Sequence, residues 1–221
     1  MVNEDVKIIE LSFVNAFLLK VADGFILIDT GLPMLWGKLE SELKASGCVP
    51  GNLKLVIITH GDPDHIGNCA KLQKQYTCKI AMHKDDVRMA EEGVSPKRKV
   101  RTLRAKIRVL KRKLKGTHIE IEKFKPDLFL HEGQNLNEYG LNASVIHIPG
   151  HTKGSIGILT SERDLFAGDI MINYQKPDKA VYIESLRDLK NSYSRLKSMG
   201  LKTIYTGHGK AFEFSEIIHK L

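Results

Sequence analysis

Short apolar runs separated by polar turns fill the first 93 residues of the chain. Ala22-Asp23-Gly24 supplies a tight turn between two of the runs, and leucines at helical spacing follow before Gly47. The continuous apolar run at residues 55–59 is typical of a strand buried on both faces. The pattern predicts strands at residues 6–11, 16–21, 25–29, 55–59 and 79–82, and helices at residues 35–45, 65–76 and 84–92.

The C-terminal half repeats this order of strands followed by a helix. The pattern predicts strands at residues 128–130, 143–148, 155–160, 165–167 and 203–205, and a helix at residues 185–198. Two such halves predict an α/β fold in which two β-layers lie between helices. At 221 residues, we expect one domain spanning residues 1–221.

Residues 94–126 separate the two halves and differ from both. Val100, Leu103, Ile107, Leu110 and Leu114 recur at spacings of three and four, with basic residues between them, which predicts an amphipathic basic helical insertion. Residues 97–115 hold 11 basic residues and no acidic one, whereas the whole chain has a net charge of +8. The basic character is therefore local, and any anionic partner must be sought at this segment.

The composition places the chain among soluble globular proteins, with 42% hydrophobic and 27% charged residues. No apolar run approaches the ~20 residues needed to cross a bilayer. The first ten residues carry acids and no apolar core typical of a signal peptide. The three cysteines, an odd number without CxxC spacing, are typical of a reducing compartment, so we expect a cytoplasmic protein.

Histidine and aspartate side chains gather where four predicted strands end. Glycine or proline flanks most of these positions and lets the backbone turn sharply beside them. Such an arrangement is typical of a site built on a rigid scaffold from separate loops. The candidate metal ligands are His60, Asp62, Asp64, His65, His151, Asp169 and His208.

Four imidazoles and three carboxylates are too many for one tetrahedral structural zinc site. They suit two divalent metal ions that share a bridging carboxylate, with zinc as the expected metal and iron or manganese as alternatives. His83 and His147 are candidates for residues that support the ligands, whereas we expect His118, His131 and His219 to be ordinary surface residues.

The chain resembles the metallo-β-lactamase superfamily over nearly its whole length. The resemblance rests on NAFLLKVADGFILIDTG at residues 15–31, THGDPDHIGN at 59–68, IPGHTKG at 148–154, Gly168-Asp169 and GHG at 207–209, in the family's order. It implies an αββα sandwich with the metal site at one edge of the two β-sheets. It also implies His60, Asp62 and His151 on a first metal, Asp64, His65 and His208 on a second, Asp169 bridging them, and Asp29 supporting the ligands.

Asp62 departs from the family's HxHxDH motif, because a carboxylate replaces the second histidine. An added negative charge makes the site less positive, so that it acidifies a bound water less and shifts the preference toward harder metals. We therefore expect weaker zinc binding at the first site. The alternative is that Asp62 is not a ligand and that only one metal binds.

The resemblance implies a metal-dependent hydrolase (EC 3.-), closer to glyoxalase II or lactonases than to true β-lactamases. We expect a metal-bound hydroxide to cleave an ester, thioester or lactone of a small molecule. Asp64 would orient this nucleophile, and Tyr174 could donate its phenol to the substrate oxyanion, although Tyr174 could equally pack at a loop end.

Residues 97–115 leave three alternatives open. The helix could pack its apolar stripe on the body, could be a lid that attracts an anionic substrate, or could bind nucleic acid or an anionic membrane. The last would favour a nuclease or phosphodiesterase of the same superfamily, which is the alternative function. A further alternative is a non-catalytic metal-binding protein that recognises a partner.

Overall fold

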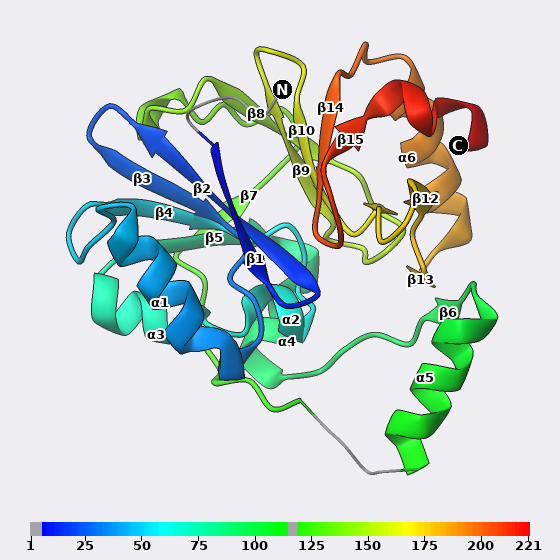
Figure 1. Ribbon diagram of the computed structural model, residues 1–221, viewed down its shortest axis with the longest axis horizontal. Helices are drawn as coiled ribbons and strands as arrows, with labels where there is room; N and C mark the ends of the chain where they lie inside the picture. Colours follow the sequence, from blue (N-terminus) through cyan, green and yellow to red (C-terminus); the bar gives the residue numbers. More distant parts are fainter. Residues whose placement is uncertain (1–5, 115–118) are drawn as a thin grey trace.

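The computed structural model describes residues 6–114 and 119–221, and Figure 1 shows two β-sheets packed between helices. The first sheet has the order β1-β2-β3-β4-β5-β7. Its strands are β1 (Val6–Leu11), β2 (Val14–Val21), β3 (Gly24–Ile28), β4 (Leu53–Ile57), β5 (Lys79–His83) and β7 (Leu128–Leu130). From β3 onward the neighbouring strands run parallel, whereas β1, β2 and β3 form an antiparallel meander.

The second sheet has the order β15-β14-β10-β9-β8. Its strands are β8 (Ala143–His147), β9 (Ile156–Thr160), β10 (Leu165–Gly168), β14 (Thr203–Thr206) and β15 (Phe212–Glu213). Because β9 is antiparallel to both β8 and β10, and β10 is parallel to β14, three strands of this sheet run in the same direction. The loops that follow β8, β10 and β14 therefore leave the sheet at one edge.

Helices cover the outer faces of both sheets. On the first sheet lie α1 (Trp36–Ala45), α2 (Pro63–Ile66), α3 (Cys69–Tyr76) and α4 (Val87–Glu92), and α6 (Leu186–Lys197) lies on the second. Short 3-10 turns occur at Pro33–Leu35, Lys84–Asp86, Asn137–Tyr139, Phe214–Glu216 and Ile218–Lys220. The predicted αββα sandwich is confirmed, while the single-domain organisation of residues 1–221 stays a prediction.

Three apolar clusters fill the spaces between the layers. One joins the first sheet to its helices, and one joins the second sheet to α6. The third lies between the sheets, where Phe17 packs edge-on against Phe166 and Tyr205, with ring centroids 5.2 and 5.8 Å away. The site therefore rests on loops that leave a close-packed sandwich. Among the described residues, no helix has the length and apolarity to cross a membrane.

The predicted helix at residues 65–76 is two helices in the structure. The chain turns at Gly67, where an added Cβ would lie 2.5 Å from the carbonyl oxygen of Gly31. Asn68 then donates its side-chain amide to the carbonyls of Thr30 and Leu32. This close approach ties the turn after His65 to the loop after β3, a constraint that hydrophobic spacing does not reveal.

The insertion forms β6 (Lys99–Val100) and α5 (Leu103–Leu114), and Figure 1 shows α5 standing away from the sandwich. Strand β6 pairs with β13 (Tyr182–Ile183), and β11 (Met171–Ile172) pairs with β12 (Asp178–Lys179), short strands that the pattern did not predict. Leu103, Ile107, Leu110 and Leu114 are all exposed, so the alternative in which this stripe packs on the body is wrong. Residues 115–118, including His118, lie outside the described residues.

Candidate metal centre

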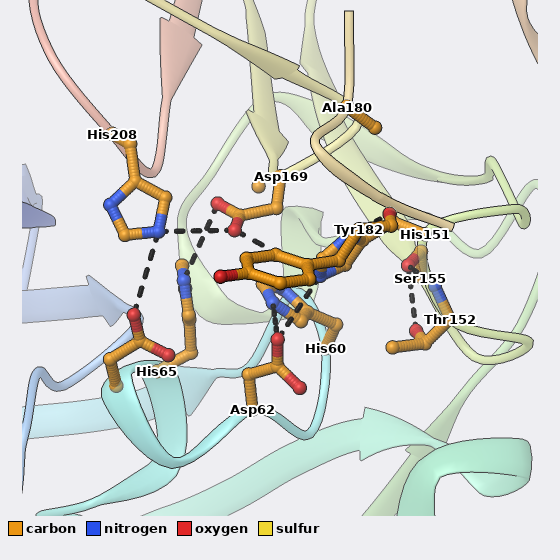
Figure 2. A network of polar contacts seen from close by, with 12 residues as sticks. His60, Asp62, His65, His151, Thr152, Ser155, Asp169, Ala180, Tyr182 and His208 are labelled. Atoms are coloured by element: carbon orange, nitrogen blue, oxygen red, sulfur yellow. Dashed lines mark hydrogen bonds and ion pairs between the residues drawn. The ribbon is translucent and has the colours of Figure 1, made fainter. Parts of the chain in front are cut away.

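The seven predicted ligands gather at the sheet edge in two clusters. The first cluster comprises His60, Asp62, His151 and Asp169, and the second cluster comprises Asp64, His65 and His208. In each cluster the candidate ligand atoms lie within 4.8 Å of one another. Figure 2 shows the labelled members of both clusters pointing toward a common centre.

Asp169 lies between the two clusters. Its Oδ1 is 3.4 Å from His65 Nε2, and its Oδ2 is 3.1 Å from His208 Nε2 and 3.9 Å from His151 Nε2. Gly207 makes room for this carboxylate, because an added Cβ there would lie 2.6 Å from Asp169 Oδ1. One carboxylate therefore faces imidazoles of both clusters, which is the position that a bridging ligand requires.

A hydrogen bond at Nδ1 orients each of the four imidazoles and leaves its Nε2 for the centre. The partners are the Thr59 hydroxyl for His60 (3.0 Å), the Asp29 carboxylate for His65 (2.8 Å), the Tyr182 carbonyl for His151 (2.9 Å) and the Phe13 carbonyl for His208 (2.6 Å). Such partners fix the tautomer and the ring orientation of metal-binding histidines.

Asp29 is fully buried behind His65 and is itself held in place. The backbone N–H of Thr59 donates to its Oδ1 at 2.9 Å, and the Thr59 hydroxyl donates to its Oδ2 at 2.8 Å. Burial alone would lower the pKa of His65, but Asp29 and Asp169 raise that pKa well above its usual value. The site therefore favours a positive charge on or beside this imidazole.

Three buried atoms in the centre have no hydrogen-bond partner among the described residues: His60 Nε2, His65 Nε2 and Asp169 Oδ1. A buried polar atom without a partner costs about 1–3 kcal/mol, so a ligand is the expected occupant. Imidazole nitrogens and carboxylate oxygens are a donor set that zinc, iron and manganese accept. The second cluster, together with Asp169, fits such an ion.

The first cluster contains a residue that the sequence analysis missed, Arg98. Its Nη1 donates to Asp62 Oδ2 at 2.6 Å, and its Nη2 contacts Asp62 Oδ1. Nη1 also lies 3.2 Å from His151 Nε2. Burial alone would raise the pKa of Asp62, but the Arg98 guanidinium holds that pKa well below its usual value. With Asp62 and His151 engaged in this way, the first cluster does not fit a metal ion as it stands.

Asp86 is a second residue that the sequence analysis missed. Its buried carboxylate accepts hydrogen bonds from the backbone N–H groups of Gly61 (2.9 Å) and Gly154 (2.8 Å) and from the Thr152 hydroxyl (2.7 Å). Asp86 therefore joins the loop that carries His60 and Asp62 to the loop that carries His151. No motif marks it, since it is the second of two adjacent aspartates in the 3-10 turn between β5 and α4.

The two clusters open into a cavity of about 1040 Å³. Asp62, Asp64, Asp169 and His208 line it, and the insertion supplies much of its wall through Arg98, Val100, Val109 and Lys97. Tyr174 also lines the cavity and is half exposed, with its ring centroid 5.6 Å from that of His208. The catalytic role of Tyr174 therefore stays a prediction.

His83 and His147, the candidates for residues that support the ligands, stack on each other with ring centroids 4.3 Å apart. His83 Nδ1 accepts from the backbone N–H of Asp85, and His147 Nε2 bonds the carbonyl of Lys153. Each imidazole is thus bonded to the backbone of the segment that follows it.

Comparison with known proteins gives the same family. The family model of the metallo-β-lactamase superfamily matches residues 9–208. Hydroxyacylglutathione hydrolase GloC of Haemophilus influenzae is 27% identical over 145 residues, which cover 62% of this chain and 61% of that protein. A β-lactamase-like protein 2 homologue of Caenorhabditis elegans is 24% identical over 202 residues, which cover 90% of this chain and 57% of that protein. The chain spans less than two thirds of the length of each.

Solved structures share the fold. A metallo-β-lactamase family protein from Thermus thermophilus superposes with a TM-score of 0.74 at 22% identity, over 99% of this chain and 77% of that one. A subclass B3 metallo-β-lactamase of Bradyrhizobium japonicum gives a TM-score of 0.72 at 19% identity, over 94% and 76%. The chain belongs to the metallo-β-lactamase superfamily.

Proposed function

We propose that this protein is a metal-dependent hydrolase that cleaves an ester, thioester or lactone of a small, anionic molecule. The observation that carries the proposal is the position of Asp169, within 3.4 Å of His65 Nε2 and 3.1 Å of His208 Nε2, with buried donor atoms lacking any other partner. Zinc is the proposed metal, with iron or manganese as alternatives. Asp64, His65, Asp169 and His208 are the proposed ligands at the second cluster.

A bound divalent metal would supply a water molecule of lowered pKa and a positive charge that stabilises the oxyanion of an acyl transition state. The protein's own groups would complete the reaction. Asp64 lines the cavity, and its Oδ2 lies 3.5 Å from His208 Nε2. In that position its carboxylate can orient the attacking water, accept the proton and pass it to the leaving alkoxide or thiolate.

The cavity wall supports an anionic acyl substrate. Arg98, Lys97 and Lys123 line it together with Glu92, Glu120 and apolar side chains such as Val100 and Val109. Cationic groups around a cleft raise the local concentration of an anionic substrate, while the apolar wall binds an acyl chain. A thioester of an anionic carrier fits this wall, in keeping with the name of the Haemophilus influenzae relative.

A substrate panel tests the proposal. The protein would be stripped with a chelator, reconstituted with zinc, iron or manganese, and assayed on thioesters, lactones, β-lactams and phosphodiesters. We expect metal-dependent cleavage of a thioester or lactone, and loss of that cleavage in His65→Ala. The exposed His131→Ala is the matched control and should leave the rate unchanged.

Two outcomes would contradict the proposal. Cleavage of phosphodiesters alone would assign the protein to the nuclease alternative. A protein that holds metal but hydrolyses no member of the panel would leave metal binding without the proposed acyl chemistry.

A further inference from the structure

Arg98 places a guanidinium group inside the first cluster. Its side chain is 10% exposed and that of Asp62 is 13% exposed, so the pair is withdrawn from bulk water. Both oxygens of Asp62 contact the two terminal nitrogens of Arg98. This two-pronged contact is the strongest arrangement that a guanidinium and a carboxylate form.

The same guanidinium engages a second candidate ligand. Because His151 Nδ1 bonds the Tyr182 carbonyl at 2.9 Å, its Nε2 carries the lone pair that a metal would need. Arg98 Nη1 lies 3.2 Å from that Nε2 and can donate to it. Two of the four side chains of the first cluster thus already face a positive charge.

The candidate ligands of the second cluster, unlike Asp62 and His151, make no contact with Arg98 in the described part of the chain. His65 Nε2 and Asp169 Oδ1 have no hydrogen-bond partner among the described residues. No cationic side chain of Arg or Lys is paired with Asp64 or Asp169 in the described part of the chain, where their ion-pair partners are histidines. The donor atoms of the second cluster are therefore available to a metal ion. In the first cluster His60 Nε2 is also without a partner, but Asp62 and His151 already contact Arg98.

Backbone pairing holds Arg98 in this place. The next two residues form β6, and Val100 is in register with Tyr182 of β13, the residue whose carbonyl orients His151. Farther along, the backbone N–H of Arg101 donates to Val181 at 2.9 Å, and its side chain bonds the Ala180 carbonyl at 3.0 Å. One small two-stranded sheet thus fixes both the arginine and the histidine that it contacts.

We propose that the Arg98 guanidinium takes the place of one metal ion, so that the protein holds a single divalent metal at Asp64, His65, Asp169 and His208. This inference rests on the proposed function and favours the alternative in which only one metal ion binds over the two ions that the sequence predicts. Arg98 has five N–H groups, of which the contacts to Asp62 and His151 use three. Because Arg98 lines the cavity, its remaining N–H groups are available to a substrate carboxylate or carbonyl oxygen.

Metal stoichiometry tests the inference without any assay of activity. The chelator-stripped protein would be titrated with Zn²⁺, and separately with Co²⁺, and the bound metal measured by elemental analysis after gel filtration. We expect one equivalent per chain in the wild type. In Arg98→Ala, Asp62 and His151 are released to act with His60, and we expect a second equivalent to bind.

Lys99→Ala is the matched control, because it removes an exposed positive charge from the residue next to Arg98. It should bind one equivalent. Arg98→Lys keeps a charge but loses the two-pronged contact, so we expect it to bind less of the second equivalent than Arg98→Ala. Circular dichroism of each variant establishes that it is folded.

Each possible stoichiometry either supports or overturns the inference that one metal ion binds. Two equivalents of equal affinity in the wild type would overturn the inference and leave the proposed function standing. One equivalent in both the wild type and a folded Arg98→Ala would show that another feature excludes the second ion, which also overturns it. No bound metal in the wild type would overturn the proposed function itself. If Arg98→Ala does not fold, the wild-type stoichiometry decides alone.

Discussion

The two clusters share Asp169 and the loop that runs from His60 to His65, yet different parts of the molecule balance their charge. In the second cluster, Asp29 and the Phe13 carbonyl hold the imidazoles, and both belong to the first sheet's own strand-end loops. In the first cluster, Arg98 comes from the insertion and pairs with Asp62. The aspartate that stands where the family's motif has a histidine is thus paired with a cation from elsewhere in the chain.

Asp64→Asn is expected to give the largest effect, because it removes the proposed proton acceptor while keeping a similar shape. General acid–base groups contribute roughly 10²–10⁴-fold to rate, so kcat should fall within that range while most of the metal is retained. Steady-state kinetics with elemental analysis measure both. Asp85→Asn, which removes an exposed carboxylate beside His83, is the control. A rate for Asp64→Asn close to that of the wild type would reject the role of Asp64.

Asp86→Ala examines how the loops of the first cluster are joined. Three donors in the interior would lose their common acceptor, which we expect to lower the free energy of unfolding by about 3 kcal/mol. For a chain of this size, that is a decrease in Tm on the order of 6 to 12 °C. Calorimetry of the metal-free protein measures it. An unchanged Tm would show that these loops hold their positions without Asp86.

Asp29→Asn tests whether the metal ion is bound by the second cluster. The partners behind metal-binding histidines typically change metal affinity by roughly 10–100-fold, and we expect a loss of that size because the orientation of His65 depends on Asp29. Competition with a chromophoric chelator measures the affinity. If the wild-type metal instead resides in the first cluster, its affinity should hardly change, and the assignment of the ion to the second cluster would be wrong.

The sequence predicts the second cluster well because two regular features coincide there. Apolar runs give the strands, and the residues that end them carry His65, Asp169 and His208 to one sheet edge. The order of the motifs indicates the family as well. These inferences depend on local spacing and on strand direction, which a single sequence records.

Arg98 and Asp86 could not be predicted, for different reasons. Arg98 is one of 11 basic residues in a run, and nothing in the run distinguishes the guanidinium that turns inward from those that face water. Asp86 acts through three donors on two distant loops, so its role exists only after folding. The α5 stripe illustrates a third limit: spacing predicts that a helix is amphipathic, but not that Leu103 and Leu110 stay exposed.

Tyr174→Phe is expected to give the smallest effect. It tests which of the two clusters binds the reacting carbonyl. The Tyr174 ring lies beside His208 of the second cluster, whereas the backbone carbonyl of Tyr182 bonds His151 of the first. If the reacting carbonyl binds at the second cluster, loss of the Tyr174 hydroxyl removes one hydrogen bond worth about 0.5–1.5 kcal/mol, and kcat should fall by about two- to tenfold. Tyr182→Phe is the matched comparison, since Tyr182 lines the same cavity and its backbone carbonyl bonds His151 of the first cluster, and it should lower kcat less than Tyr174→Phe. A larger loss in Tyr182→Phe than in Tyr174→Phe would place the chemistry at the first cluster and reverse the comparison.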